Sequence, residues 1–177
     1  MKNKPNLENA YNLKSPDDNI KLYSVWAETY DNSFIVDMQY KLHFAVAKEF
    51  VLNGGKGLIL DVGAGTGALA EALLQKAKFC IEATDISEEM LKVADSKKIY
   101  KRSFLSDLTK EIPVDNGSYD GVVSSGTFTH GHVGPSSIRE LVRVTKPGGL
   151  ITISINENHW IAFDFESEVE KLNKYIR

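Results

Sequence analysis

The chain has 177 residues, of which 42% are hydrophobic and 25% are charged, as in a single soluble globular domain with a sizeable core. The net charge is −3 and acidic and basic residues are mixed along the sequence, which argues against nucleic acid or an anionic membrane as the partner. The first 19 residues are polar, and no apolar run approaches the roughly 18 residues that a membrane span needs. We therefore expect a cytoplasmic protein.

The domain organisation is predicted from changes in composition along the chain. Residues 1–19 are rich in Asn, Lys, Asp and Pro, and we expect a flexible arm there. Residues 20–177 are expected to form a single domain. Within it, apolar residues at helical spacing predict two helices in residues 20–55, the second ending near Asn53-Gly54-Gly55.

Strand and helix patterns alternate from residue 56 to the end. Strands are predicted at 57–62, 79–85, 99–105, 119–124 and 150–155, with helices over 69–74, after Ser87, over 138–145, and from Phe165 to the last residue. This alternation predicts an α/β fold with a mostly parallel, doubly wound sheet covered by helices on both faces. Ligands bind such sheets beyond the carboxyl ends of the strands, so the turns after the first four strands should meet at one cleft.

A glycine-rich turn, Gly63-Ala64-Gly65-Thr66-Gly67, follows the first predicted strand and opens a helix. Glycine permits a tight turn and lets a ligand touch the backbone, while free N–H groups at the helix start favour an anionic group. The motif alone is ambiguous, because Gly63, Gly65 and Ala68 also satisfy a dinucleotide-binding pattern. A simple strand-to-helix turn is the remaining alternative.

Acidic residues at the ends of three strands narrow the choice of ligand. Asp61 would repel a pyrophosphate but suits a cation such as S-adenosylmethionine, although it could simply cap nearby N–H groups. Asp85 could accept hydrogen bonds from both ribose hydroxyls, or it could be only an acid at the start of the next helix.

Asp107 could accept a hydrogen bond from the adenine amino group, or it could be an acid in an ordinary loop. Ile86, Met90 and Leu108 would then pack against the adenine, with core packing as the alternative for Met90.

Taken together, residues 58–155 resemble the class I S-adenosylmethionine-dependent methyltransferases. The matching segments are the glycine motif from Asp61 to Gly67, the ribose acid Asp85, the adenine-side acid Asp107, the fourth strand Tyr119–Ser124, and the segment Leu141–Gly149. More narrowly, the chain resembles the Williams–Beuren-type methyltransferase-like proteins. The resemblance implies a Rossmann-like, three-layer αβα fold that binds S-adenosylmethionine and releases S-adenosylhomocysteine.

The same resemblance supplies further candidate residues. Tyr23 and Tyr30 lie in a segment that resembles the family's lid helix and would approach the methionine part of the cofactor, with ordinary helix packing as the alternative. Ser124 ends the fourth strand and Ser125 opens the loop after it, and both are candidate cofactor contacts. In the family, this loop lies beside the transferable methyl group.

A general base is needed only if the methyl acceptor must lose a proton. His130 is the candidate for that role, with His132 second and polar surface as the alternative for both. No third ligand with suitable spacing accompanies them, so no metal site is expected.

The sequence departs from the family pattern at its end. Complete members add an antiparallel hairpin after the fifth crossover helix, and residues 156–177 leave no room for it. We therefore expect a five-stranded sheet in the order 3-2-1-4-5 with the fifth strand near an open edge. That edge predicts either a homodimer through the sheet edge or masking by residues 156–177.

The leading functional hypothesis is methyl transfer to a small-molecule acceptor. The loop after the fourth strand lacks the paired prolines typical of enzymes that methylate amino groups of nucleobases. The first alternative is a truncated or inactive domain that binds S-adenosylmethionine and acts with a partner. The second is a nicotinamide-dependent oxidoreductase, against which Asp61 is the main argument.

Overall fold

The computed structural model describes residues 5–175. The elements in chain order are α1 (Leu7–Tyr11), α2 (Pro16–Tyr30), the π-helical turn η1 (Asp31–Val36), α3 (Leu42–Leu52), β1 (Leu58–Val62), α4 (Ala68–Leu74), β2 (Cys80–Asp85), α5 (Glu88–Ser96), β3 (Arg102–Leu105), β4 (Tyr119–Phe128), the 3₁₀ turn η2 (Pro135–Ser137), α6 (Ile138–Val144), β5 (Thr145–Ile155), α7 (Glu157–Ala162) and α8 (Phe165–Leu172).

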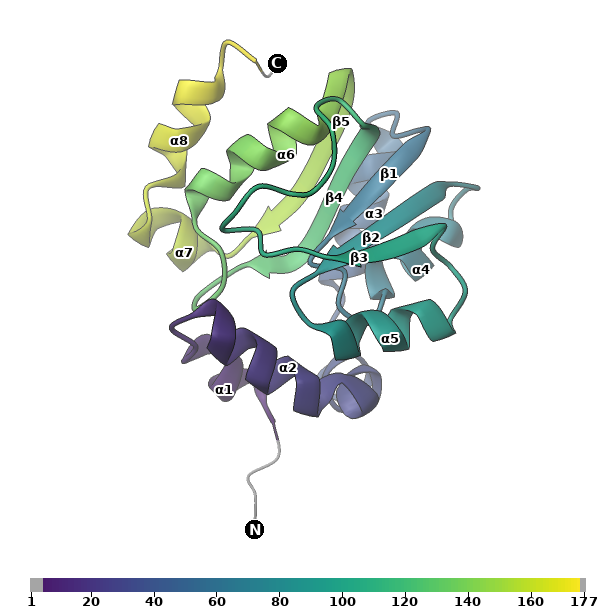
Figure 1. Cartoon of the computed structure of the whole chain (residues 1–177), viewed down its shortest axis with the longest axis vertical. Helices are drawn as coiled ribbons and strands as arrows, with labels where there is room; N and C mark the ends of the chain where they lie inside the picture. The colour runs from purple at the N-terminus through teal and green to yellow at the C-terminus, as the bar shows by residue number, and fades with distance from the viewer. Residues whose placement is uncertain (1–4, 176–177) are drawn as a thin grey trace.

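The five strands form one sheet in the order β3-β2-β1-β4-β5, and every neighbouring pair is parallel. This confirms the predicted order and the Rossmann-like class. The order reverses between β1 and β4, so the carboxyl ends of β1, β2 and β4 face a common space. The amino-terminal helices α1 and α2 lie across that end of the sheet (Figure 1).

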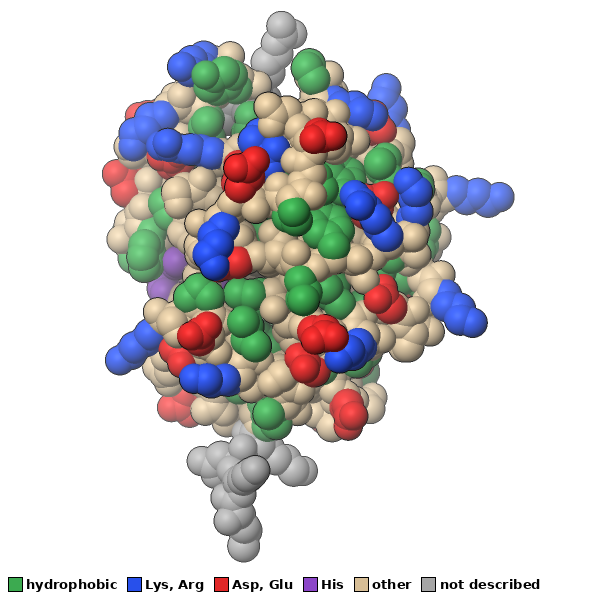
Figure 2. All heavy atoms as spheres, in the orientation of Figure 1, with side chains coloured by type: hydrophobic (Ala, Val, Ile, Leu, Met, Phe, Trp, Pro, Cys, Tyr) green, Lys and Arg blue, Asp and Glu red, His purple; other side chains and the backbone are tan. Residues whose placement is uncertain are grey.

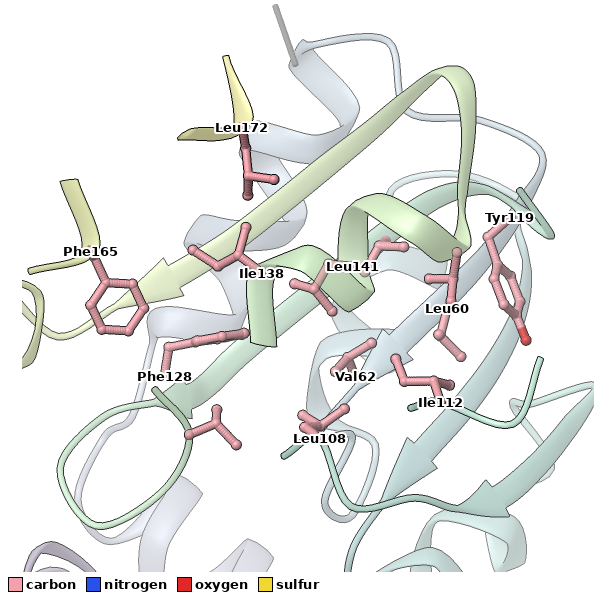
Figure 3. Close-up of a cluster of buried hydrophobic side chains, with 13 residues drawn as sticks. Leu60, Val62, Leu108, Ile112, Tyr119, Phe128, Ile138, Leu141, Phe165 and Leu172 are labelled. Carbon is pink, nitrogen blue, oxygen red and sulfur yellow. The ribbon is translucent and has the colours of Figure 1, made fainter. Parts of the chain in front are cut away.

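Side-chain alternation along β1 divides the core between the two faces of the sheet. Leu60 and Val62 point to the face covered by α6 and α8, where Ile138 and Leu141 of α6 pack toward them (Figure 3). On the opposite face, Ile59 packs with buried residues of α3 and α4. The sheet is thus covered on both faces, as a three-layer αβα fold requires.

The amino-terminal segment differs from the flexible arm expected over residues 1–19. Ser15 caps α2 by accepting from the N–H of Asp18, and Pro16 occupies the first helical turn, so α2 begins four residues before the predicted domain boundary. Ala10 of α1 is 3% exposed and packs beside Trp26. Residues 1–4 of the predicted arm lie outside the described residues.

The carboxyl-terminal segment also differs from its prediction. A short helix, α7, precedes α8, and α8 ends at Leu172, before the last residue. Phe165 is fully buried and packs against Phe128 of β4 with a ring-centroid distance of 6.3 Å (Figure 3). Helix α8 packs against α6 and η2, so it covers this face of the sheet. The homodimer through the edge of β5 stays a prediction.

The surface in the orientation of Figure 1 carries acidic and basic side chains interspersed with apolar ones (Figure 2). Among residues 5–175, no helix is both long enough and apolar enough to cross a membrane.

Candidate functional site

One cavity of about 260 Å³ lies at the carboxyl ends of the strands, under α1 and α2. Its lining has two parts. Turns after β1, β2 and β3 form one part, which we call the strand end. Residues of α1, α2 and η1 together with the loop after β4 form the other, which we call the lid end.

The glycine-rich turn contributes Gly63 and Gly65 to the strand end, but Ala64 and Gly67 do not line the cavity. Gly63 has a φ of +66°, and a Cβ atom there would lie 2.1 Å from the Thr127 hydroxyl oxygen. Ala64 is buried in the core, and Gly67 caps α4 with a φ of +94°. Two of the four predicted turn contacts therefore have structural roles in the turn itself.

Asp85 at the end of β2 lines the cavity, as predicted. Its carboxylate accepts from the backbone N–H of Gly65 at 2.8 Å and of Ser87 at 2.9 Å. Burial raises the pKa of Asp85, and these backbone N–H groups partly offset the effect because they stabilise the charged form. The carboxylate is thus fixed at the cavity wall, and each oxygen retains a lone pair for a ligand hydroxyl.

The predicted adenine-side residues Ile86, Met90, Asp107 and Leu108 also line the strand end. Burial alone would raise the pKa of Asp107, but hydrogen bonds from Thr109 and the ion pair with Lys110 outweigh it and lower the pKa. Asp107 is therefore an anionic acceptor.

The neighbouring Ser106 hydroxyl lines the cavity and has no hydrogen-bond partner within the described chain. A buried hydroxyl of this kind is a ready site for a ligand hydrogen bond.

Asp61 lies behind the cavity wall and is 1% exposed. One carboxylate oxygen accepts from the Tyr100 hydroxyl at 2.7 Å, and the other has no partner among the described residues. Burial raises the pKa of Asp61 to about 7, while the bond from Tyr100 opposes the shift. Asp61 is thus a buried acid that does not line the cavity, and its contact with a ligand stays a prediction.

The predicted lid residues Tyr23 and Tyr30 line the lid end, together with Tyr40 after η1. Burial raises the pKa of all three phenols, so each is neutral and can donate a hydrogen bond. Tyr40 lies within hydrogen-bond distance of Ser125, at 3.2 Å between their oxygens. Trp26 also reaches the cavity, although it is 2% exposed and belongs to the core of the lid.

The loop after β4 places His132 in the cavity wall, whereas His130 is not a lining residue. The ring of His130 instead packs edge-on against Tyr11 and His159, with centroid distances of 6.2 and 5.4 Å. The geometry thus shifts the candidate base from His130 to His132.

Of the two serines at the end of β4, Ser125 lines the cavity and Ser124 does not. The Ser124 hydroxyl donates to the carbonyl of Val62 at 2.6 Å and is fully buried between strands. Its role is to join β4 to β1, which differs from the predicted cofactor contact.

Polar contacts fasten the lid to the strand end. The carboxylate of Asp31, at the end of α2, accepts from the Thr66 hydroxyl and pairs with Lys97 at 2.7 Å. At the other end of α2, the Asn19 side chain donates to the carbonyl of Gly131 at 2.9 Å. Both contacts connect the lid directly to loops that line the cavity.

The sequence analysis missed several lining residues. Tyr11, Pro16 and Asn19 fall in the range expected to be an arm. The run Ser15-Pro16-Asp17-Asp18 is a helix-start pattern and could have revealed that α2 begins early. Tyr40 carries no motif, and its contact with Ser125 of β4 joins segments that are far apart in the sequence.

Comparison with known proteins gives three findings. A family model described as methyltransferase domain matches residues 60–153, which is more than half of the chain. The chain is 31% identical over 153 residues to human methyltransferase-like protein 27, covering 84% of this chain and 62% of that protein. It is 36% identical over 117 residues to the ubiquinone/menaquinone biosynthesis C-methyltransferase UbiE of Burkholderia mallei, covering 62% of this chain and 46% of that protein.

Among solved structures, the DhpI-SAM-HEP complex matches with a TM-score of 0.61 and 23% identity, over 82% of this chain and 69% of that one. Similarity at this identity shows the fold. The chain spans less than two thirds of the length of the two curated relatives.

Proposed function

We propose, from the premise that the chain belongs to the S-adenosylmethionine-dependent methyltransferase family, that it transfers a methyl group from S-adenosylmethionine to a small-molecule acceptor. The observation that carries the proposal is one cavity with two chemically different ends. Its strand end holds fixed acids and a glycine turn, and its lid end holds neutral aromatic and hydroxyl side chains.

The residues of the strand end fit the parts of the cofactor. Asp85 presents a fixed carboxylate for the ribose hydroxyls, and Asp107 with the unpartnered Ser106 hydroxyl suits the adenine edge. The pKa of Asp61 is raised to about 7, and a cationic ligand nearby would favour its charged form. When bound, the cofactor supplies a methyl group activated by a positively charged sulfur.

The lid end supports a small acceptor because residues of α1, α2 and η1 line this part of the cavity. The residues of this chain orient the acceptor and exclude water, and proximity of the two reactants supplies much of the rate enhancement. The human and Burkholderia relatives extend beyond the aligned region, so the identity of the acceptor is a question for experiment.

Calorimetric titration tests the cofactor assignment. We expect S-adenosylhomocysteine to bind and NAD not to bind. Asp85→Asn should weaken the binding of S-adenosylhomocysteine by about 10- to 100-fold, because a hydrogen bond to a charged group contributes about 1.5–3 kcal/mol. Asp115→Asn, an exposed acid outside the cavity, is the matched control and should leave binding unchanged. Binding of NAD alone would contradict the assignment.

A labelled methyl group tests the acceptor class. The protein is incubated with methyl-labelled S-adenosylmethionine and either the small-molecule or the macromolecular fraction of a cell extract. The proposal predicts label in small molecules. Label found only in protein or nucleic acid would refute the assignment of a small-molecule acceptor.

A further inference from the structure

We propose that Tyr23 and His132 form a proton relay that takes the proton from a planar, uncharged acceptor hydroxyl, such as a phenol. The inference rests on the proposed function and adds to it the chemical class of the acceptor and the group that activates it. It starts from two hydrogen bonds that fix the His132 ring and from the character of the lid end.

The backbone fixes the tautomer of His132. Its Nδ1 lies 2.8 Å from the carbonyl oxygen of His130, and a carbonyl can only accept, so Nδ1 carries the proton. In the neutral ring the lone pair is therefore on Nε2, which lies 2.8 Å from the Tyr23 hydroxyl oxygen. Tyr23 donates to His132, and the phenol oxygen is left free to accept a proton from a ligand.

The lid end favours an uncharged, flat acceptor. None of the described lining residues is a lysine or arginine, and the two acids of the lining lie at the strand end. Tyr23, Tyr30 and Trp26 form a contiguous aromatic wall, with centroid distances between 5.0 and 6.1 Å. Flat rings pack well on such a wall, whereas an ionised acceptor would lose its hydration without an opposite charge nearby.

The same environment explains why a base is needed. Burial raises the pKa of Tyr23, Tyr30 and Tyr40, and an acceptor hydroxyl at the same place experiences the same loss of solvation. Such a hydroxyl stays protonated unless a neighbouring group takes its proton. Burial lowers the pKa of His132, so its Nε2 is unprotonated at neutral pH.

The groups around the relay come from four parts of the chain. Burial has the largest effect on His132 and lowers its pKa, the hydrogen bond to the His130 carbonyl raises it, and His159 of α7 lowers it. Tyr11 of α1, Tyr40 and Asp85 face Tyr23 and raise its pKa. The net effect disfavours both a histidinium and a tyrosinate at rest, which suits a relay that transfers a proton only while the acceptor reacts.

The acceptor oxygen forms a bond to the methyl carbon, and the carbon–sulfur bond breaks with its electron pair left on sulfur. The acceptor proton passes to the Tyr23 oxygen as the Tyr23 proton passes to Nε2 of His132. The products are the methyl ether, S-adenosylhomocysteine and a protonated His132, which then releases its proton to solvent.

Methylation of 4-methylphenol, a phenol that is uncharged at neutral pH, tests the relay, with the methyl ether measured by chromatography. His132→Gln should lower kcat by about 100-fold or more, since general-base catalysis contributes about 10²- to 10⁴-fold, with the affinity for S-adenosylhomocysteine unchanged. Tyr23→Phe should lower kcat similarly. His130→Gln is the matched control, because it keeps the carbonyl that holds His132, and its kcat should stay within a few-fold of wild type.

The pH profile gives a second readout. Wild-type activity should fall as pH falls through the pKa of His132, below the ordinary value of 6.5, and His132→Gln should lose this acid limb. Equal rates and profiles in wild type and His132→Gln would overturn the proposal. So would failure of 4-methylphenol and related uncharged phenols to be methylated by a protein that binds S-adenosylmethionine.

Nitrogen NMR of labelled histidine tests the relay without turnover. In the S-adenosylhomocysteine complex, the neutral His132 ring should carry its proton on Nδ1 and should titrate below 6.5. A proton on Nε2 of the neutral ring would refute the relay. Failure of S-adenosylhomocysteine to bind at all would instead refute the proposed function, so the two failures are distinguishable.

Discussion

Replacing Gly63 by alanine adds one methyl group at the point where the glycine turn meets the loop after β4. Gly63 has a φ of +66°, in the left-handed region, and the added Cβ would lie 2.1 Å from the Thr127 hydroxyl oxygen. Gly65 is the matched comparison, because its φ is +54° but nothing lies within 4 Å of an added Cβ. The two substitutions share the backbone cost and differ in the steric one.

The expected costs follow from those two terms. The left-handed conformation costs a residue other than glycine about 1–2 kcal/mol, which applies to both variants. Moving Thr127 costs about 1–2 kcal/mol more in overpacking and in the weakened hydrogen bonds from its hydroxyl to the carbonyls of Val62 and Gly63. Gly63→Ala should therefore destabilise the fold by about 3 kcal/mol and Gly65→Ala by about 1–2 kcal/mol.

Urea unfolding of both variants measures this difference, and calorimetry with S-adenosylhomocysteine measures binding. Gly65 lines the cavity, so Gly65→Ala should reduce the binding free energy of S-adenosylhomocysteine more than it reduces the free energy of unfolding. Equal unfolding free energies for the two variants would refute the steric argument. Unchanged binding by Gly65→Ala would show that the ligand does not approach this turn.

Three further predictions concern the buried acid, the carboxyl-terminal helix and the lid. The pKa of Asp61 is raised to about 7 from 3.8. Between these pH values the folded state keeps a proton on Asp61 that the unfolded state has lost. The free energy of unfolding should therefore fall as pH rises from about 4 to about 7. Urea titrations of Asp61→Asn across that range should lack this part of the slope, and an identical slope would contradict the assignment. Phe165→Ala should lower the free energy of unfolding, measured by heat or urea, by about 3–5 kcal/mol because the ring is fully buried. Phe163→Ala is the control, and because this ring is 53% exposed it should lower the free energy by about 1 kcal/mol or less. Similar losses in the two variants would show that α8 is not part of the core. Asp31→Asn removes the ion pair to Lys97 that holds the end of α2. The amide hydrogens of α2 should therefore exchange faster, and S-adenosylhomocysteine should bind more weakly. Unchanged hydrogen exchange would refute this role of Asp31.

The sheet could be predicted from the sequence because its signals are local. Short apolar runs, the Ser87 cap and the glycine turn each specify one element, and connection rules then fix the strand order once the family pattern is recognised. The positions of Asp85 and Asp107 follow from the same rule, since strand ends in a parallel sheet converge. These acids line the cavity as the sequence analysis expected.

The lid end could not be predicted in the same way, because packing over long sequence separations determines it. His132 enters the cavity and His130 does not, although only one residue separates them. The choice depends on Gly131, which has a φ of +76° and whose carbonyl accepts from Asn19 more than 100 residues earlier in the chain. No local pattern records that contact. Asp61 lies at the end of its strand as expected but does not line the cavity, and its hydrogen bond from Tyr100 also joins distant segments.

A crystal structure of the protein with S-adenosylhomocysteine tests the central claim most directly, namely that one cavity holds the cofactor at its strand end and the acceptor at its lid end. We expect the ribose hydroxyls to lie within hydrogen-bond distance of Asp85 and the cofactor sulfur to face a space bounded by Tyr23 and His132. Adenosine bound elsewhere, or a sulfur that faces away from His132, would contradict it.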